Sequence, residues 1–195
     1  MSAYPPEIIY RELKIDDFPS LREIGHQCLP LPYPDTYWLR IASDANNYYS
    51  LGAYNKQQKL VGVIGVIRYA KNYFSGRLLN PDEQKLIDSY SKVCYITTLM
   101  VAPDCRKKGI ATQLLQRAST VLLQEGRHLL YLHVLHSNVP AIRLYEKMGY
   151  EKVTVIADYY TIDGQKQPGV VYCRRLVAPM CHECITNNVG SCTIL

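Results

Sequence analysis

A short basic run at residues 106–111, Arg-Lys-Lys-Gly-Ile-Ala, has the clearest chemical potential in the sequence. It lies between a strand-like apolar run at residues 95–101 and a helix-like run at residues 110–124. The first N–H groups of a helix have no acceptors, and the helix dipole adds partial positive charge there. Such a turn binds phosphate or diphosphate, and Gly109 lets the backbone approach the anion closely. The alternative is a solvated basic turn that happens to precede a helix, and these six residues alone do not decide between the two.

The elements that would position this turn follow from alternation, apolar stripes and turn signals. Strands are predicted at residues 7–13, 48–54, 60–69, 93–101, 129–135, 150–161 and 170–176, with a hairpin turn at residues 163–169. Helices are predicted at residues 16–28, 35–41, 110–124 and 138–147. Residues 70–91 are polar and aperiodic, which predicts an irregular insertion that is functional or mobile rather than core. This order predicts a mixed α/β domain with helices packed on a largely antiparallel sheet.

Composition describes an ordinary globular chain of 195 residues, with 48% hydrophobic and 20% charged residues. We expect one domain at residues 1–176 and a flexible, cysteine-containing tail at residues 177–195. The apolar runs are too short to cross a bilayer, and residues 1–4 lack the features of a signal peptide. These features predict a cytoplasmic protein, and we expect a monomer.

The net charge of +5 suits an anionic ligand or an acidic lipid surface. The cations gather at one loop without an aromatic platform, so nucleic-acid binding is not expected. Seven cysteines in a chain without an export signal are expected to be reduced thiols, and no metal site is predicted.

The pattern Arg106-x-x-Gly109-x-Ala111 resembles the pyrophosphate loop of the GNAT N-acetyltransferases. Residues 130–134, Leu-Tyr-Leu-His-Val, resemble the fifth strand of that fold, and residues 138–150 resemble its closing helix and following strand. The resemblance extends over residues 7–176. It implies the GNAT fold and acetyl-CoA as the co-substrate, with no metal.

Further stretches are similar to protein N-terminal acetyltransferases of the NatE and NatF types. They are residues 95–99, 131–134 and 158–160, and residues 29–35 look like the substrate loop of the same group. The long insertion before the fourth strand fits the NatF type better. The sequence departs from NatF-type loops at Leu29, where an aromatic residue is usual, and at Pro32, where an acidic residue is usual. The resemblance therefore implies acetylation of protein N-termini but leaves the preferred first residues open.

Amine chemistry agrees with this resemblance, because an amine attacks a thioester only when it is neutral. An α-amino group has a pKa of about 7.7–8.0, whereas a lysine side chain has a pKa near 10.4. Removing a proton from an N-terminus is therefore within reach of a histidine. His133 is the candidate base, acting through ordered water. The resemblance implies that Tyr95 orients that water or relays the proton, and that Tyr145 protonates or hydrogen-bonds the departing thiolate.

The resemblance also implies two sets of binding residues. The residues expected to contact the co-substrate are Leu99, Met100, Val101, Arg106, Lys107, Lys108, Gly109, Ile110, Ala111, Asn138 and Tyr145, of which the first three would offer backbone donors to the oxyanion. The residues expected to bind the peptide are Leu29, Pro30, Leu31, Tyr33, Tyr95, His133, Tyr159 and Tyr160. Purely structural readings stay open: His133 as a hydrogen-bonded core residue, Tyr145 as a packing residue, and Tyr159 and Tyr160 as an edge strand.

The tail carries a separate set of signals. Its last four residues begin with Cys192 and fit a prenylation box, and the terminal leucine favours geranylgeranylation. One lipid binds reversibly, so Cys181 and Cys184 are candidates for palmitoylation as a second signal. Together they predict association with the cytosolic face of the Golgi or another endomembrane. Half a zinc site and a disordered tail with incidental cysteines are the alternatives.

The sequence leaves three functions open. The first is acetyl transfer from acetyl-CoA to protein N-termini. The second is acetylation of lysine or a small amine on the same fold. The third is a domain that binds coenzyme A or a partner without turnover.

Overall fold

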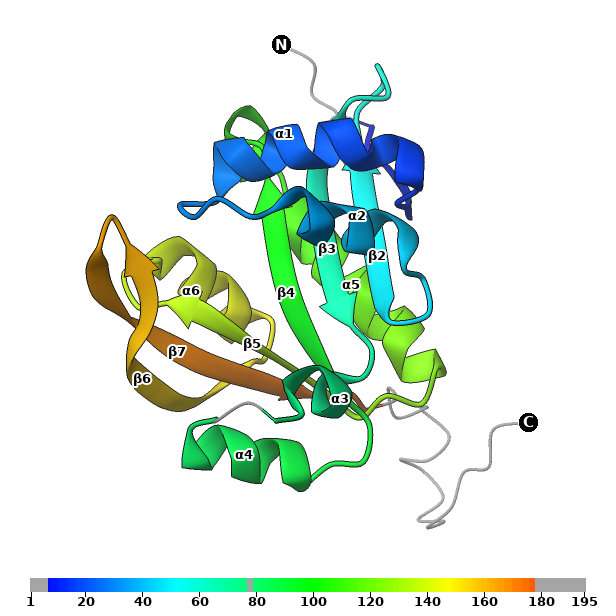
Figure 1. The fold of residues 1–195 in the computed structure, drawn as a ribbon. Helices are drawn as coiled ribbons and strands as arrows, with labels where there is room; N and C mark the ends of the chain where they lie inside the picture. The colour runs from blue at the N-terminus through cyan, green and yellow to red at the C-terminus, as the bar shows by residue number, and fades with distance from the viewer. Residues whose placement is uncertain (1–6, 77–78, 178–195) are drawn as a thin grey trace.

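The structure, a computed structural model, describes residues 7–76 and 79–177. At its centre lies a seven-stranded sheet with the order β1-β2-β3-β4-β5-β7-β6 (Figure 1). The strands are β1 (Ile9–Glu12), β2 (Tyr48–Tyr54), β3 (Leu60–Ile67), β4 (Val93–Val101), β5 (Leu129–Leu135), β6 (Glu151–Ile162) and β7 (Gln165–Arg175). The helices in this part of the chain are α1 (Phe18–Cys28), α2 (Asp35–Ser43), α3 (Ala70–Phe74), α4 (Pro81–Asp88), α5 (Ile110–Gln124) and α6 (Val139–Lys147), with short 3-10 turns η1 (Ile15–Asp17) and η2 (Pro103–Cys105).

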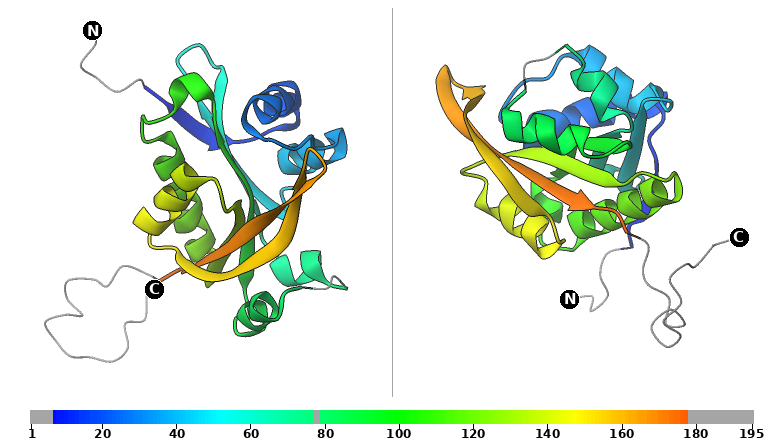
Figure 2. Two further views of the ribbon diagram at one scale, coloured as in Figure 1. Left: turned by 90° about the vertical axis from the view of Figure 1, so that its left-hand side faces the viewer. Right: turned by 90° about the horizontal axis from the view of Figure 1, so that it is seen from below.

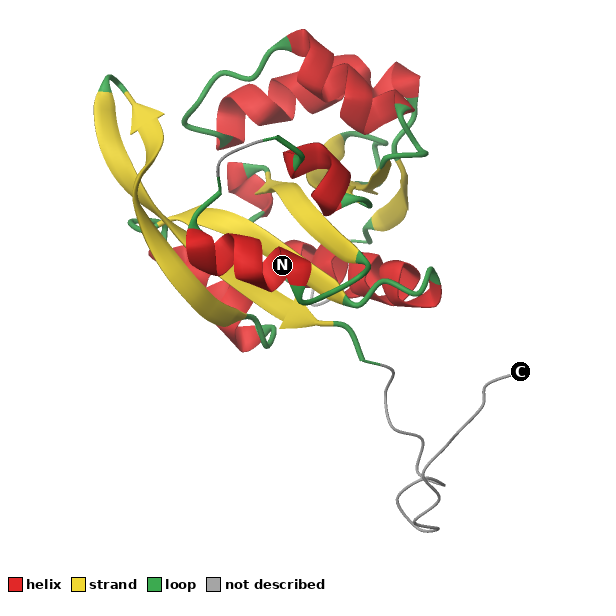
Figure 3. Ribbon diagram, turned by 60° about the horizontal axis from the view of Figure 1, so that its bottom comes forward, coloured by secondary structure: helices red, strands yellow, loops and turns green. Residues whose placement is uncertain are grey.

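Helices cover both faces of the sheet, as the two views of Figure 2 show. On one face, α5 buries a continuous apolar stripe that includes Leu114, Leu115 and Leu122, and α6 packs beside it. On the other face, α1 and α2 pack around Trp38 against β3. Figure 3 shows the hairpin of β6 and β7 curving beyond these layers. The arrangement confirms the predicted mixed α/β class, with helices packed on a largely antiparallel sheet.

The junction between β4 and β5 is the one parallel pairing in the described sheet. Only three residue pairs join the two strands, from Val93 with Leu129 to Tyr95 with Tyr131. Beyond them the strands diverge, which Figure 1 shows as a wedge between β4 and β5. On its other edge β4 stays paired with β3 as far as Val101, with an irregularity where Thr97 has no partner in the register. The wedge therefore opens at the carboxyl ends of β4 and β5.

Several predicted bounds are confirmed, namely the strands at residues 93–101 and 129–135 and the helix at residues 110–124. The prediction of an irregular insertion at residues 70–91 is wrong, since α3 and α4 lie there and bury Phe74 and Ile87. The insertion has start signals, with Asn80 capping α4 through Asp82 N. Its few apolar positions were too sparse to show a period.

The predicted seven-residue turn at residues 163–169 is also wrong. Only Asp163 and Gly164 connect β6 to β7, and residues 165–169 belong to β7. Both turn residues have positive φ, 50° and 75°. Two left-handed residues in succession make the tight turn whose twist suits a two-residue hairpin. The Asp-Gly pair signals this turn, but the polar run after it obscured the start of β7.

Candidate active site

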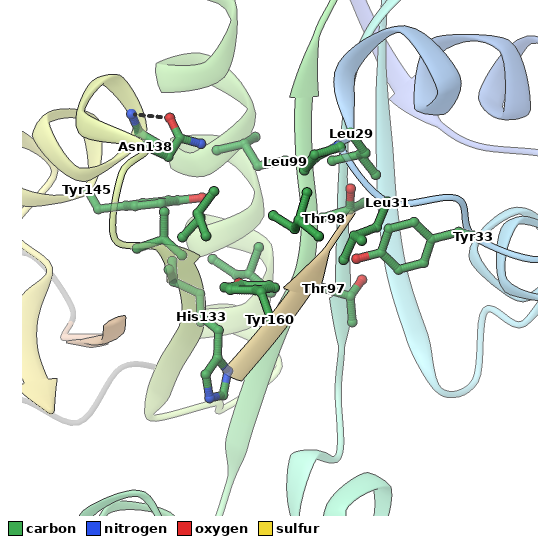
Figure 4. Close-up of a pocket in the computed structure, with 17 residues that line it drawn as sticks. Leu29, Leu31, Tyr33, Thr97, Thr98, Leu99, His133, Asn138, Tyr145 and Tyr160 are labelled. Atoms are coloured by element: carbon green, nitrogen blue, oxygen red, sulfur yellow. Dashed lines mark hydrogen bonds between the residues drawn. The ribbon is translucent and has the colours of Figure 1, made fainter. Parts of the chain in front are cut away.

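Two cavities occupy the wedge between β4 and β5. The inner cavity has a volume of about 160 Å³ and is lined by β4, β5, α6, residues 29–33 and the end of β6 (Figure 4). The outer cleft, of about 630 Å³, continues along the residues that lead into α5. The residues that line both are Leu29, Pro30, Leu99, Asn138, Ala141 and Tyr145. A long ligand in the outer cleft can therefore present one end to a second ligand in the inner cavity.

The outer cleft ends at the first turn of α5. Gly109 is the N-cap residue of this helix, with a φ of 79°, and a Cβ added there would meet open space. Ile110, Ala111 and Thr112 line the cleft, and their N–H groups have no acceptors within the helix. These groups, with the positive end of the helix dipole, make the turn a binding site for an anion such as a diphosphate.

The three predicted cations of this turn differ in their placement. Arg106 and Lys107 line the outer cleft. The Nε atom of Arg106 donates to the carbonyl oxygen of Val101 at 3.1 Å, which holds the turn against the end of β4. Lys108 is not among the lining residues, because its ammonium group folds back onto the carbonyl oxygen of Asp104 at 2.9 Å. The side chain of Lys108 therefore stabilises the loop and leaves the contact with an anion to its neighbours.

The free edge of β4 supplies a second set of backbone donors. The N–H group of Ala102 donates to the carbonyl oxygen of Val61 on β3. The backbone N–H groups of alternate residues before Ala102 therefore also face β3. By this alternation the N–H groups of Leu99 and Val101 point into the wedge. Met100 lines the cleft as well, but its N–H group faces β3. Two of the three predicted oxyanion donors are therefore available to a ligand.

Helix α6 contributes Asn138 and Tyr145 from the opposite wall (Figure 4). The Oδ1 atom of Asn138 accepts from Ala141 N–H at 3.3 Å and so caps the helix. The ring of Tyr145 reaches from α6 toward the inner cavity. Burial raises the pKa of the Tyr145 hydroxyl well above its usual value of 10. The hydroxyl is therefore protonated at neutral pH and can donate a hydrogen bond to an anion where the two cavities meet.

A buried polar network surrounds His133, which lines the inner cavity from β5. Its Nδ1 atom lies 3.2 Å from the hydroxyl of Tyr95, and its Nε2 atom lies 3.4 Å from Oε1 of Glu83. The side chains of His133 and Glu83 are 1% and 2% exposed. The ring of Tyr159 stacks on the imidazole at a centroid distance of 4.0 Å. The structure thus brings Tyr95 and His133 together, as predicted, and encloses the imidazole completely.

Oε1 of Glu83 and Nε2 of His133 lie near each other but do not form a hydrogen bond. A carboxylate accepts hydrogen bonds only, so the nearby Glu83 favours the tautomer with the proton on Nε2, and with that tautomer Nδ1 accepts from the Tyr95 hydroxyl. Carboxylate, imidazole and hydroxyl in this order form the arrangement that activates a hydroxyl in nucleophilic catalysis. Burial, followed by the nearby Tyr159 and Tyr160, raises the pKa of Tyr95 well above 10. Tyr95 therefore passes a proton on rather than holding a negative charge.

Sequence analysis missed Glu83, because α4 lies in the insertion that showed no period. The carboxylate also faces the hydroxyl of Tyr131, which lies on β5 beside Tyr95 on β4. A carboxylate in a polar insertion is usually solvated, and nothing in its spacing relates it to a histidine fifty residues later. Only the packing of α4 against β4, β5 and β6 brings the two groups together.

The predicted peptide-binding residues divide into two groups. Leu29, Pro30, Leu31 and Tyr33 line the inner cavity from the loop between α1 and α2, and Tyr160 lines it from β6. Tyr159 and Tyr95 pack against the imidazole of His133 and are not among the lining residues. Lining residues that sequence analysis missed are Ile96, Thr97, Thr98, Leu132, Val134, Leu135 and Ile162 in the inner cavity, Cys28, Cys105, Thr112, Pro140 and Leu144 in the outer cleft, and Ala141 in both.

Residues 7–76 and 79–177 contain no group of three or more His, Cys, Asp or Glu residues placed to hold a metal ion. None of the helices in this part of the chain combines the length and the apolar character needed to cross a membrane. The predicted lipidation sites Cys181, Cys184 and Cys192 lie outside the described residues.

The sequence and the fold have counterparts among known proteins. A family model described as "Acetyltransferase (GNAT) family" matches residues 11–150. A protein of Xenopus tropicalis named N-alpha-acetyltransferase 60 is 32% identical over 173 residues, covering 85% of this chain and 69% of that protein. An N-alpha-acetyltransferase of Saccharolobus solfataricus is 28% identical over 161 residues, covering 80% of this chain and 86% of that protein. The crystal structure of Arabidopsis thaliana NAA60 in complex with acetyl-CoA has a TM-score of 0.72 and 23% identity, covering 87% of this chain and 99% of that one.

The turn at Gly109 generates a prediction for acetyl-CoA, the co-substrate that the sequence resemblance implies. Gly109→Val places a β-branched residue at a left-handed φ, which tilts the N–H groups away from the anion. We expect the dissociation constant for acetyl-CoA to rise at least about tenfold, measured by isothermal titration calorimetry.

Gly164→Val is the matched control for this substitution. Gly164 has a φ of 75° and equally open surroundings, but it lies in the turn between β6 and β7. Its variant should bind acetyl-CoA as the unchanged protein does. If Gly109→Val and Gly164→Val both bind acetyl-CoA as tightly as the unchanged protein does, the turn at Gly109 does not hold the ligand.

Proposed function

We propose that this chain, which belongs to the GNAT acetyltransferase family, transfers the acetyl group of acetyl-CoA to the α-amino group of protein N-termini. The observation that carries the proposal is the meeting of the outer cleft with the small inner cavity, next to the network of Tyr95, His133 and Glu83. The relatives named N-alpha-acetyltransferase support the same substrate class.

The residues of the outer cleft fit acetyl-CoA. The N–H groups of Ile110, Ala111 and Thr112 would receive the diphosphate, with Arg106 and Lys107 adding positive charge. The acyl end would then reach the residues that the two cavities share. There the N–H groups of Leu99 and Val101 would stabilise the negative charge that develops on the carbonyl oxygen.

The inner cavity suits the end of a peptide chain. Its volume of about 160 Å³ accommodates little more than one or two residues, and Leu29, Leu31 and Tyr160 provide apolar walls. The neutral amine attacks the thioester carbonyl, a C–N bond forms and the C–S bond breaks. The surplus proton leaves the amine, and the thiolate takes a proton or a hydrogen bond from Tyr145.

Both ring nitrogens of His133 already face partners, so the amine cannot contact the imidazole directly. We infer that its proton reaches His133 through water and the hydroxyl of Tyr95, because Tyr95 contacts Nδ1 of His133 but does not itself line the inner cavity. The carboxylate of Glu83 then balances the positive charge of the imidazolium. This path suits an α-amino group, whose pKa of about 7.7–8.0 lies close to neutrality, better than a lysine with a pKa near 10.4.

The proposal extends to the membrane through the tail. Cys192 begins a prenylation box, and Cys181 and Cys184 offer the second lipid that stable anchoring needs. With these lipids the enzyme would work at the cytosolic face of the Golgi or another endomembrane, where it would meet the N-termini of proteins. The support for this part lies in the sequence alone, and a fractionation experiment tests it separately.

A peptide panel tests the transfer reaction. Purified protein with acetyl-CoA should acetylate peptides with a free N-terminus, which mass spectrometry would locate on the α-amino group. A matched peptide with a blocked N-terminus and a free lysine should stay unmodified. His133→Ala should lower kcat by about 10²–10⁴ with a small effect on the KM for acetyl-CoA. Transfer to the lysine of the blocked peptide at an equal rate would favour the lysine function, and binding of acetyl-CoA without transfer would favour the non-catalytic one.

Glu83→Gln tests the network behind the base. The amide preserves the shape of the side chain but cannot balance an imidazolium, so we expect kcat to fall by about 10- to 100-fold at an unchanged KM for acetyl-CoA. Because the variant removes the charged partner of a buried pair but keeps an acceptor oxygen, thermal stability should fall or stay equal. Asp82→Asn changes the exposed neighbour on α4 and should leave both quantities unchanged. A lower melting temperature with normal kcat would assign Glu83 a purely structural role.

Cys192→Ser tests the lipid. In cells that prenylate proteins, the unchanged chain should partition with membranes and the variant should move to the soluble fraction, because a prenyl group needs the cysteine thiol. Thr193→Ser keeps the box intact and serves as the control. Identical fractionation of all three chains would contradict prenylation at this site.

A further inference from the structure

A separate cleft of about 380 Å³ lies at the far end of α5 from Gly109. Since α5 has 15 residues, about 22 Å separate its two ends. The cleft is bounded by the end of β3, the start of α3, the start of β4 and the turn after α5. Its lining residues are Arg68, Tyr69, Lys71, Asn72, Ser91, Lys92, Val93, Glu125 and Arg127. It shares no lining residue with the two cavities of the candidate active site.

The charges that line this cleft are strongly unequal. Four cationic side chains line it, those of Arg68, Lys71, Lys92 and Arg127, against the single carboxylate of Glu125 among the lining residues. Arg68 already occupies that carboxylate, with Nε 3.0 Å from Oε2 and Nη2 3.0 Å from Oε1. Arg68 also donates to the carbonyl oxygens of Ala45 and Tyr48, so it is fixed as part of the wall. Arg127 makes a longer ion pair with the same carboxylate, so four cations share one negative charge and the lining keeps a net positive charge.

Arg127 is the cation that a ligand would satisfy best. Its side chain is only 9% exposed, and its Nε atom lies 3.7 Å from Glu125, beyond hydrogen-bond distance. Within the described residues this buried Nε has no hydrogen-bond partner. The guanidinium lies 4.3 Å from the ring centroid of Tyr69, which fixes its plane. The Nε atom itself is closed to solvent, so an anion in the cleft would not contact it but would compensate the charge of the guanidinium, which is costly to bury without a counter-charge.

Lys92 and Lys71 approach the same space from two sides. A Cβ on Gly126 would lie 3.2 Å from the Nζ atom of Lys92, so the absence of a side chain at Gly126 makes room for the ammonium group. Lys71 begins on α3, on the opposite side, and is exposed. Ammonium groups with rotatable donors and a planar guanidinium are the side chains that bind phosphate oxygens.

We propose that this cleft binds a phosphate group, held by Arg127, Lys92 and Lys71, at a site distinct from that of the acetyl-CoA diphosphate. The phosphate can come from the headgroup of an anionic lipid or from a soluble phosphate ester. The position of the cleft favours the lipid. Leu176 N–H donates to the carbonyl oxygen of His128, the residue after Arg127, so the described chain ends beside the cleft. The site would orient the domain on an anionic surface and goes beyond the proposed acetyl transfer.

A charge-neutralising pair tests the site in the full chain. Lys71→Gln with Lys92→Gln removes two exposed cations and leaves the buried Arg127 and its packing untouched. Lys147→Gln with Lys152→Gln is the control, because it removes two exposed cations from α6 and β6 and alters the net charge equally. Two probes are used with each protein: inorganic phosphate, followed by calorimetry and by amide chemical shifts, and phosphatidylcholine vesicles with and without phosphatidic acid, followed by sedimentation.

The unchanged protein should bind phosphate saturably, with the largest shifts at residues 125–127. The cleft variant should bind at least about tenfold more weakly, as expected when two cations beside an anion are removed, and the control pair should match the unchanged protein. Binding to phosphatidic acid vesicles with the same dependence on the lysines would identify the lipid as the source, and binding of free phosphate alone would identify a soluble ester. Equal weakening in both pairs, or no saturable binding of either probe, would overturn the proposal. These readouts need no acetyl transfer, so they stand whether or not the proposed reaction is found.

Discussion

The divergence of β4 from β5 after three residue pairs is the constraint on which the site depends. Unpaired strand edges are costly because each exposed N–H and carbonyl group needs a partner. Here part of that edge is satisfied from within, since the carbonyl oxygen of Val101 accepts from Arg106 and from the thiol of Cys28. The hydroxyl of Tyr37 donates to the carbonyl oxygen of Thr97 in the same way, at 3.4 Å. The N–H groups of Leu99 and Val101 remain for a ligand, so the interruption that weakens the sheet also creates the donors that acetyl transfer requires.

The network around His133 is coupled to the insertion by packing. Phe74 lies with its ring centroid 5.0 Å from that of Tyr95, and the same apolar cluster contains Ile87. Packing of this cluster buries Glu83, which lies on the same helix as Ile87. A buried carboxylate is stable only beside groups that can donate hydrogen bonds to it or balance its charge. His133 and Tyr131 are the polar groups that lie beside it, with Nε2 of His133 at 3.4 Å. The segment that the sequence marks as peripheral therefore favours one tautomer of the histidine, which links the stability of an insertion to the chemistry of the central strands.

The sequence predicts the elements that show a local repeat of apolar residues. It also predicts turns that need a single residue with an unusual backbone conformation. The stripe of α5 and the apolar alternation of β4 fix their own bounds, and Gly109 identifies the anion-binding turn because few other residues adopt its left-handed φ. What depends on long-range packing escapes such reasoning. The irregularity at Thr97 leaves no compositional trace, and the pairing of Glu83 with His133 joins α4 to β5 across a tertiary contact. The two-residue turn at Asp163 and Gly164 lies between these cases, because its dipeptide was informative and its polar surroundings were misleading.

The two ends of α5 carry opposite partial charges, so different groups are available to bind an anion at each end. At the N-terminus the helix itself offers N–H groups and partial positive charge, so backbone atoms can hold an anion. At the C-terminus the dipole is negative and worth only about 0.3–1 kcal/mol to a nearby cation. The last carbonyl oxygens there are already satisfied, since the N–H groups of Glu125, Gly126 and Arg127 donate back to the final turn of the helix. Capping of the helix therefore does not account for a guanidinium that is nine-tenths buried and two lysines converging on one space. Side-chain cations are what an anion site at that end of a helix would need, because the backbone there cannot provide the positive charge.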